Sequence, residues 1–212
     1  MIIPDGDRRY AKKKGVTKID AYKKAAKIVR NLVDWVLVRN EISEFTLFGL
    51  SYSNIARRIT EDLQPVLEVQ SHTLTQFAED YLPHKYGIKV IVSGEKHLLP
   101  REYQHAITTI EEVTQNYSKR KLNILIGYSG KLDFERALQK TLQQHTTPTL
   151  ENILKNSSIE TPIDYLIRTA GEKRVSDSPL FALQNTEFYF IDKLFPEVTK
   201  KDIDRALKAF KP

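Results

Sequence analysis

Leu122-Asn-Ile-Leu-Ile126 is a short apolar run that ends in the polar turn Gly127-Tyr-Ser-Gly130. An apolar run of this length, bounded by turn residues, is typical of a buried β-strand. Apolar residues at helical spacing predict one helix before this run, over about residues 99–117, and another after it, over about 132–143. A buried strand between two helices indicates a mostly parallel sheet with helices on its faces.

The same alternation continues toward both ends of the chain. The other predicted strands are residues 1–3, 45–50, 88–92, 165–167 and 188–190. The other predicted helices are residues 18–39, 61–82 and 199–210. No linker rich in Pro, Gly or Ser divides the chain, so we expect residues 1–212 to form one α/β domain. Ligands bind beyond the carboxyl ends of the strands in such sheets, which directs attention to residues 4–9, 51–57, 127–131 and 168–176.

Composition excludes several kinds of site. The chain has 212 residues and no cysteine, so disulfides, thiolate nucleophiles and Cys-bound metals are excluded. The net charge of +6 fits a site for phosphorylated small molecules or a weak attraction to anionic lipid. Aromatic residues are not interleaved with a basic stripe, so we expect no nucleic-acid partner. Without a long apolar run or a signal-peptide pattern, the expected location is the cytoplasm, with peripheral membrane contact as an alternative.

The segment from Pro4 to Tyr10 could bind a diphosphate. Gly6 permits a tight turn, and a helix that begins after it would direct backbone N–H groups at an anion. Arg8 and Arg9 can bind phosphate oxygens. A carboxylate such as Asp5 fits a phosphate site when a magnesium ion bridges the two groups. The alternative interpretation is a surface turn followed by a solvated helix.

Two further segments follow predicted strands. Arg168 and Arg174 flank a glycine turn, with the Ser176 hydroxyl close behind, which favours a clamp for a second phosphate group; a charged surface loop is the alternative. The segment from Ser51 to Asn54, with Arg57, could bind a ligand or cap the next helix. Other chemistries lack a pattern: the five histidines form no close metal pair, and the chain has no GxxxxGK[ST], GxGxxG, GxSxG or DDxxD motif.

Taken in order, five segments resemble the conserved blocks of the cis-prenyltransferase (undecaprenyl diphosphate synthase-like) family. Residues 4–15 resemble M-D-G-N-G-R-W-A-K-x-x-G, and residues 51–57 resemble F-S-x-E-N-W-x-R. Residues 122–130 are similar to L-N-I-x-x-x-Y-G-G-R. Residues 163–176 are similar to V-D-L-x-I-R-T-G-G-E-x-R-x-S, and residues 187–192 to E-L-Y-F-T-D. The resemblance covers essentially the whole chain.

The resemblance implies a six-stranded, mostly parallel sheet, an apolar product tunnel lined by residues 45–50 and 61–82, and a dimer. It also implies a Mg²⁺-dependent condensation of an allylic prenyl diphosphate with isopentenyl diphosphate, with release of diphosphate. Asp5 would be the catalytic residue and a metal ligand, and Glu187 a second metal ligand. Gly6 and Arg9 would hold the allylic diphosphate, and Arg168, Arg174 and Ser176 the isopentenyl diphosphate. The other residues expected at the substrates are Asp7, Arg8, Tyr10, Lys18, Tyr22, Ser51, Asn54 and Arg57.

The chain also departs from the family blocks. Asp7-Arg8 stands where the blocks have Asn-Gly, Tyr22 where they have His, and Ala170 where they have Gly. Ser53 and Ile55 replace an acidic residue and a Trp, and the chain ends at Lys211-Pro212 without the terminal R-x-G of homodimeric members. These departures favour an altered allylic site, with a short or irregular product or a different acceptor as open alternatives. A non-catalytic subunit of a heteromeric prenyltransferase is the alternative from another class, so both a homodimer and a heteromer stay open.

Overall fold

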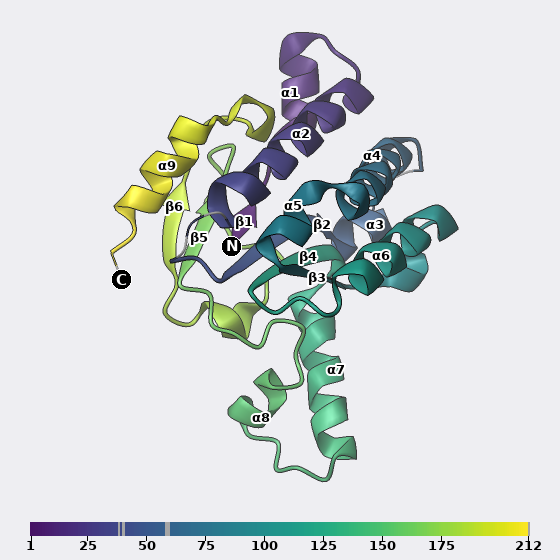
Figure 1. Ribbon diagram of the computed structural model, residues 1–212, viewed down its shortest axis with the longest axis vertical. Coiled ribbons are helices and arrows are strands. Elements are labelled where there is room, and N and C mark those ends of the chain that lie inside the picture. The colour runs from purple at the N-terminus through teal and green to yellow at the C-terminus, as the bar shows by residue number, and fades with distance from the viewer. Residues whose placement is uncertain (38, 40, 58–59, 212) are drawn as a thin grey trace.

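The computed structural model describes residues 1–37, 39, 41–57 and 60–211. Within these residues, six parallel strands form one sheet in the order β3-β4-β2-β1-β5-β6 (Figure 1). The strands are β1 (Ile2–Ile3), β2 (Glu44–Ser51), β3 (Ile88–Ser93), β4 (Arg120–Tyr128), β5 (Tyr165–Arg168) and β6 (Glu187–Phe190). The expected α/β fold with a six-stranded, mostly parallel sheet is confirmed.

The helices follow the predicted pattern with small differences. They are α1 (Asp7–Lys14), α2 (Lys18–Leu37), α3 (Tyr52–Arg57), α4 (Thr60–Glu79), α5 (Tyr81–Tyr86), α6 (Arg101–Thr114), α7 (Gly130–Gln143), α8 (Leu150–Leu154) and α9 (Lys200–Ala209). The helix predicted over 61–82 is two helices, because the Asp80 carboxylate accepts a hydrogen bond from the Leu82 N–H at 3.1 Å and starts a new one. The last residues of the helix predicted over 18–39 include residue 38, which lies outside the described part of the chain.

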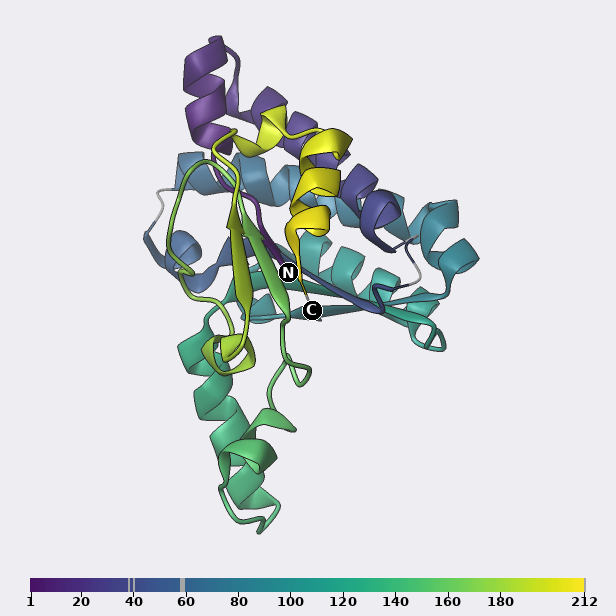
Figure 2. The same ribbon diagram turned by 90° about the vertical axis from the view of Figure 1, so that its left-hand side faces the viewer.

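The two faces of the sheet are covered differently. Neighbouring strand residues alternate between two apolar clusters, as the side-chain period of a strand requires: Leu47 and Ile124 belong to one, Phe48 and Leu125 to the other. The larger cluster also contains residues of α2, α4, α6 and α9. The smaller cluster includes Ile159, Ile163 and Ala182 from the segment between α8 and β6. Figure 2 shows α2 and α9 on one side of the sheet and α7 and α8 projecting from the other.

The strand order reverses direction at β1. β1 lies between β2 and β5, and the chain reaches these two strands by crossovers in opposite directions. Open parallel sheets bind ligands at such a switch point, beyond the carboxyl ends of the strands. The residues that leave the sheet here are Asp5 after β1, Ser51 at the end of β2 and Arg168 at the end of β5.

The first turn of the last helix, α9, contains a carboxylate that accepts hydrogen bonds from three donor groups. Asp202 accepts hydrogen bonds from the Thr199 N–H at 2.9 Å, the Thr199 hydroxyl at 2.6 Å and the Lys193 ammonium at 2.8 Å. Burial raises the pKa of this carboxyl, but the hydrogen bonds from Lys193 and Thr199 outweigh it and lower the pKa to about 2. The ionised Asp202 carboxylate therefore contributes its full stabilisation of the fold at pH values above the ordinary pKa of an aspartate. This stabilisation is lost as the pH falls from about 4 toward 2.

We expect Asp202→Ala to lower the free energy of unfolding by about 1–2 kcal/mol at pH 7, the usual cost of losing a helix cap. The deficit should shrink as the pH falls toward 2, since the wild-type carboxyl then becomes protonated as well. Urea unfolding of both proteins between pH 7 and pH 2.5 measures this difference. An equal deficit at every pH would contradict the assigned role of the ionised carboxylate.

Candidate active site

Asp5 is held rigidly where β1 leaves the sheet. Its backbone N–H donates to the Thr169 hydroxyl at 2.8 Å, and that hydroxyl donates to the Asp5 carbonyl at 2.9 Å. The same carbonyl accepts from the Phe195 N–H at 2.9 Å. The Asp5 side chain is partly exposed, so its carboxylate sits at the edge of solvent on a fixed backbone.

Arg168 links Asp5 to the loop that follows β5. Its Nη2 donates to Asp5 Oδ2 at 3.0 Å, and its Nη1 donates to Ser176 Oγ at 2.9 Å and to the Arg174 carbonyl. The side chain is only 3% exposed, so the guanidinium is a buried cation with a fixed orientation. One side chain thus bridges the first and the second predicted phosphate segments.

The loop after β5 folds back over α1. Arg9 reaches this loop, pairing with Glu172 Oε1 at 2.9 Å and donating to the Ala170 carbonyl at 3.3 Å. Arg9 Nη2 also lies 3.5 Å from Asp5 Oδ1, a long contact. Gly6 has φ +109°, and a Cβ there would lie 2.9 Å from Leu194 Cδ2, so the turn before α1 requires glycine.

Arg8 and Lys18 converge on a residue that the sequence did not suggest. Arg8 Nη2 pairs with Asp62 Oδ2 at 2.9 Å, and the Lys18 ammonium pairs with the other oxygen of the same carboxylate. Asp62 lies in the first turn of α4, so this cluster joins α1, α2 and α4. The large side chain of Arg8 is therefore directed across the site toward α4.

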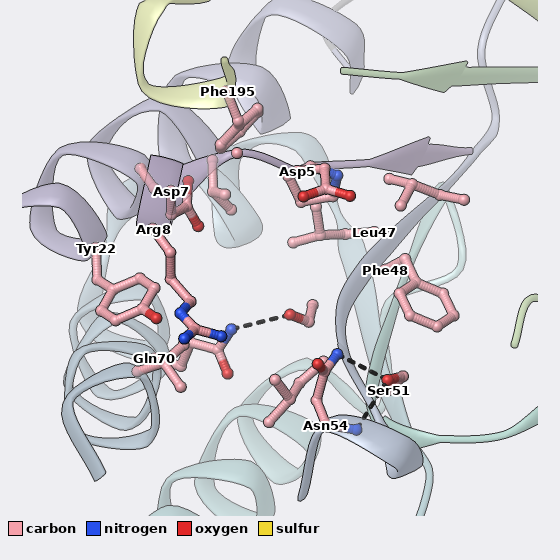
Figure 3. A pocket seen from close by; sticks show the side chains of 18 of the residues that line it. Asp5, Asp7, Arg8, Tyr22, Leu47, Phe48, Ser51, Asn54, Gln70 and Phe195 are labelled. Carbon is pink, nitrogen blue, oxygen red and sulfur yellow. Dashed lines mark hydrogen bonds between the residues drawn. The ribbon is translucent and has the colours of Figure 1, made fainter. Parts of the chain in front are cut away.

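Ser51 caps the helix that follows β2. Its hydroxyl accepts from the Asn54 N–H at 3.1 Å and from Asn54 Nδ2 at 2.7 Å, as Figure 3 shows. Helix capping, one of the two interpretations of this segment, is thus confirmed. The second interpretation, that this segment binds a ligand, stays a prediction, because Ser51, Asn54 and Arg57 all line the cavity described next.

A cavity of about 970 Å³ brings the predicted site residues together (Figure 3). Apart from Tyr10 and Glu187, each residue predicted to bind substrate or metal is among those that line it. Among the described residues, seven basic side chains and three carboxylates line the cavity, which makes its polar end a site for anions. The basic residues are Arg8, Arg9, Lys12, Lys18, Arg57, Arg168 and Arg174.

The other end of the cavity is apolar. Ala25 and Val29 of α2 and Val66 and Val69 of α4 face Leu47 of the sheet, with Phe195 near the polar end. A second cavity of about 820 Å³ lies farther along the same two helices. The two cavities adjoin, because they share the lining residues Ala26, Val29, Leu47, Val69, Thr73, Leu74 and Ile124.

Two predicted residues lie elsewhere. Tyr10 is buried between α1 and α2, where its hydroxyl accepts from Lys24 Nζ at 2.7 Å. Glu187 is exposed at the start of β6, opposite Tyr165, whereas Arg168 is paired with Phe190 at the far end of that strand. Three residues of strand separate Glu187 from that end, about 10 Å. Within one chain, Glu187 and Asp5 therefore lie at opposite ends of the sheet, and the metal role of Glu187 stays a prediction.

Several residues that contact or line the site were not predicted, among them Thr169, Glu172 and Asp62. Thr169 and Glu172 lie within residues 163–176, the segment that resembles a conserved family block, so the sequence did point to their neighbourhood. No pattern in the sequence pointed to Asp62, because its partners are 54 and 44 residues away in the chain.

Asp5 can contribute to a magnesium site that the substrate completes. Among the described residues, no group of three or more His, Asp or Glu side chains is placed to hold a metal ion. Mg²⁺ keeps several waters and commonly binds one or two carboxylates plus substrate phosphates, so a single carboxylate next to a diphosphate site fits it. No helix in the described part of the chain has the length and apolar character to cross a bilayer.

Comparison with known proteins gives one consistent result. The family model described as undecaprenyl diphosphate synthase matches residues 3–212. The chain is 35% identical to the geranylgeranyl-diphosphate-specific tritrans,polycis-undecaprenyl-diphosphate synthase of Pyrobaculum aerophilum, over 95% of this chain and 87% of that protein. It is 32% identical to the isoprenyl transferase of Aquifex pyrophilus, over 99% of this chain and 90% of that protein.

Among solved structures, lavandulyl diphosphate synthase from Lavandula x intermedia, in complex with dimethylallyl diphosphate, superposes with a TM-score of 0.85. The two chains are 25% identical, and the match covers 98% of this chain and 92% of that one. The first relative and this structure carry names of diphosphate synthases, and the second relative carries the name of an isoprenyl transferase.

Proposed function

Because the chain belongs to the undecaprenyl diphosphate synthase family of cis-prenyltransferases, we propose that it condenses an allylic prenyl diphosphate with isopentenyl diphosphate. One observation carries the proposal: a single cavity joins a cluster of basic side chains around Asp5 to an apolar end between α2, α4 and the sheet. A substrate with a diphosphate head and a hydrocarbon tail needs both ends of such a cavity.

The chemistry requires two diphosphates side by side. The C–O bond of the allylic donor breaks and diphosphate leaves with the electron pair, while the double bond of isopentenyl diphosphate forms the new C–C bond and a proton is lost. In our proposal, Asp5, Gly6 and Arg9 hold the donor's diphosphate. Arg168, Arg174 and Ser176 hold the acceptor's diphosphate, since charge-assisted contacts from guanidinium groups suit phosphate oxygens.

Magnesium, bound by Asp5 and the donor's diphosphate, would neutralise charge on the leaving group. Arg168 keeps the Asp5 carboxylate at the mouth of the cavity, where it can meet that ion. Glu187, as a second ligand, would have to reach the site from another subunit, because in its own chain it lies at the other end of β6.

The two adjoining cavities support a product longer than the first cavity alone would hold. The second cavity adds about 820 Å³ along α2 and α4. A long product would partition into membranes, so our proposal includes a cytoplasmic enzyme with peripheral membrane contact. A non-catalytic subunit is the second candidate, but the retained Asp5 and the clustered arginines favour a working site.

The deciding experiment combines purified protein, magnesium, labelled isopentenyl diphosphate and allylic diphosphates of several lengths, followed by chromatography of the products. We expect prenyl diphosphates with new cis double bonds, and the preferred donor and product length identify the specific reaction. No product with any donor, from a folded protein, would favour the non-catalytic subunit instead.

We further propose that the enzyme is a homodimer assembled through the β6 side of the sheet. β6 is one of the two edge strands of the sheet in the described part of the chain. Phe188 on this strand is 44% exposed and stacks on Phe190 at 6.3 Å between ring centroids. Phe181, also exposed, packs on Phe134 of α7 at 4.7 Å. An exposed apolar edge of this kind is a usual place for association.

Phe188→Glu is expected to convert the dimer to a monomer, because a charge at the centre of an apolar interface costs more than the contact it replaces. Sedimentation velocity across a range of protein concentrations measures the change. Tyr81→Glu is the matched control, since Tyr81 is 68% exposed on α5, away from β6. If Phe188→Glu stays dimeric, the interface lies elsewhere; if the wild type is monomeric at every concentration, a different partner is required.

A further inference from the structure

Among the described residues, Asp62 pairs with cations from two other helices. Arg8 of α1 donates through Nη2 at 2.9 Å, and Lys18 of α2 donates through its ammonium. The Asp62 side chain is 17% exposed, whereas Arg8 is 52% and Lys18 44% exposed. The carboxylate is therefore more buried than the two cations that it holds.

Stability alone is a weak reason for this cluster. An exposed ion pair contributes only about 0–1 kcal/mol, and two cations held at one carboxylate repel each other. Asp62 is well suited to hold them, because it lies in the first turn of α4, where the helix dipole stabilises a negative charge. The arrangement keeps two like charges adjacent in a place where they would otherwise separate.

The two cations face the cavity of about 970 Å³. Among the described residues, Arg8 and Lys18 line this cavity, whereas Asp62 does not. Figure 3 shows Arg8 extending from α1 across the cavity, on the same side as Tyr22. A guanidinium has five N–H groups and an ammonium three, so each cation keeps donors for a further anion after it contacts Asp62.

We infer that Asp62 is a positioning residue, which holds Arg8 and Lys18 as a preformed pair for the diphosphate of the allylic donor. This inference rests on the proposed function and adds a specificity element to it. Position 8 is Gly in the family blocks that the sequence resembles, so the Arg8 half of the pair departs from those blocks. Preorganised cations bind an anion more tightly, because ordering them is no longer part of the binding step.

The test uses inorganic pyrophosphate as the probe and isothermal titration calorimetry at fixed ionic strength. Asp62→Asn, which keeps the shape and removes the charge, is expected to raise the Kd about tenfold, the loss of roughly one charge-assisted contact. Asp80→Asn is the matched control: Asp80 also joins α4's end to α2, through Arg30 at 2.7 Å, and asparagine preserves its role as a helix cap. Its Kd should stay at the wild-type value.

Two further measurements separate positioning from a purely structural role. In an Arg8→Met/Lys18→Met background, Asp62→Asn should no longer weaken pyrophosphate binding, because the two cations that the inference assigns to the diphosphate are gone. In steady-state assays with a prenyl donor, Asp62→Asn should raise the donor KM with kcat within twofold of wild type.

Equal or tighter pyrophosphate binding by Asp62→Asn would overturn the inference, since Asp62 would then be neutral or a competitor of the anion. An unchanged Asp62→Asn effect without the two cations would overturn it as well. Thermal unfolding of each variant detects any loss of fold, and Asp62→Glu, which keeps the charge, should bind pyrophosphate more tightly than Asp62→Asn does. Failure of the proposed function has a different signature: the wild type binds pyrophosphate but forms no prenyl product.

Discussion

Asp5→Asn is expected to lower kcat for prenyl transfer by about 100- to 1,000-fold, the usual effect of removing one preorganised charged group at a developing charge. Asparagine is the informative replacement here because its amide oxygen still accepts the hydrogen bond from Arg168. Alanine would also leave the buried Arg168 without this partner, which would mix a folding defect into the result. The donor KM should change little compared with kcat, since the interaction develops with the leaving group.

Initial rates at saturating substrates, measured over a series of magnesium concentrations, provide the readout. Asp20→Asn is the control: Asp20 lies in the first turn of α2 and is not among the residues that line the cavity. A near-normal kcat for Asp5→Asn at saturating magnesium would remove Asp5 from the reaction. A loss that higher magnesium fully restores would limit its role to metal affinity.

The fold was predictable because each element carries its own local pattern. Ile2–Ile3 is the extreme case: two residues form β1, the strand between β2 and β5 at the switch point of the sheet. The break at Pro4-Asp5-Gly6 marked the end of that strand in the sequence. The boundary between α4 and α5 was missed, since the apolar spacing runs through Asp80 and only the hydrogen bond to Leu82 shows the new start.

The arrangement of the loop after β5 could not be predicted. Ala170 has φ +68° and Ser176 has φ +55°, left-handed conformations that only glycine adopts without cost. Neither residue type signals such a turn. The loop accepts this strain in a framework set by other contacts: the Ala170 carbonyl accepts from Arg9, and Ser176 accepts from Arg168.

Charge pairing was the least predictable feature. The segments that carry Asp5, Arg9 and Arg168 were identified because their residue types suit phosphate binding, and the structure brings all three together. Their partners depend on which elements the fold places side by side. Arg8 therefore pairs with Asp62 on α4, a contact for which no spacing in the sequence gives a rule.

The arginines after β5 are expected to differ in their effects, because they differ in burial. Arg174 is 61% exposed and contacts Glu172, whereas Arg168 is 3% exposed and contacts both Asp5 and the loop. Arg174→Ala should raise the KM of isopentenyl diphosphate about ten- to one-hundredfold, the loss of one charge-assisted contact worth roughly 1.5–3 kcal/mol. The donor KM should stay near the wild-type value.

Arg168→Ala should have the larger effect. It removes the donor to Ser176 and to the Arg174 carbonyl, so the acceptor KM should rise at least as much as in Arg174→Ala. It also releases the Asp5 carboxylate, so kcat should fall in the same variant. Together these losses predict a decrease of about 1,000-fold or more in kcat/KM for the acceptor. The lost binding contact accounts for about ten- to one-hundredfold in acceptor affinity, and the lost orientation of Asp5 accounts for the rest.

Arg168→Lys separates the charge of this side chain from its geometry. An ammonium preserves the positive charge but cannot bridge Asp5 on one side and Ser176 on the other, as the planar guanidinium does. If the bridge is what matters, Arg168→Lys should lose most of the activity that Arg168→Ala loses, and single-turnover rates with both substrates prebound will reveal the part due to Asp5. Recovery of full activity by lysine would mean that only charge is required. An equal rise of donor and acceptor KM in Arg174→Ala would contradict the division of the cavity into two diphosphate sites.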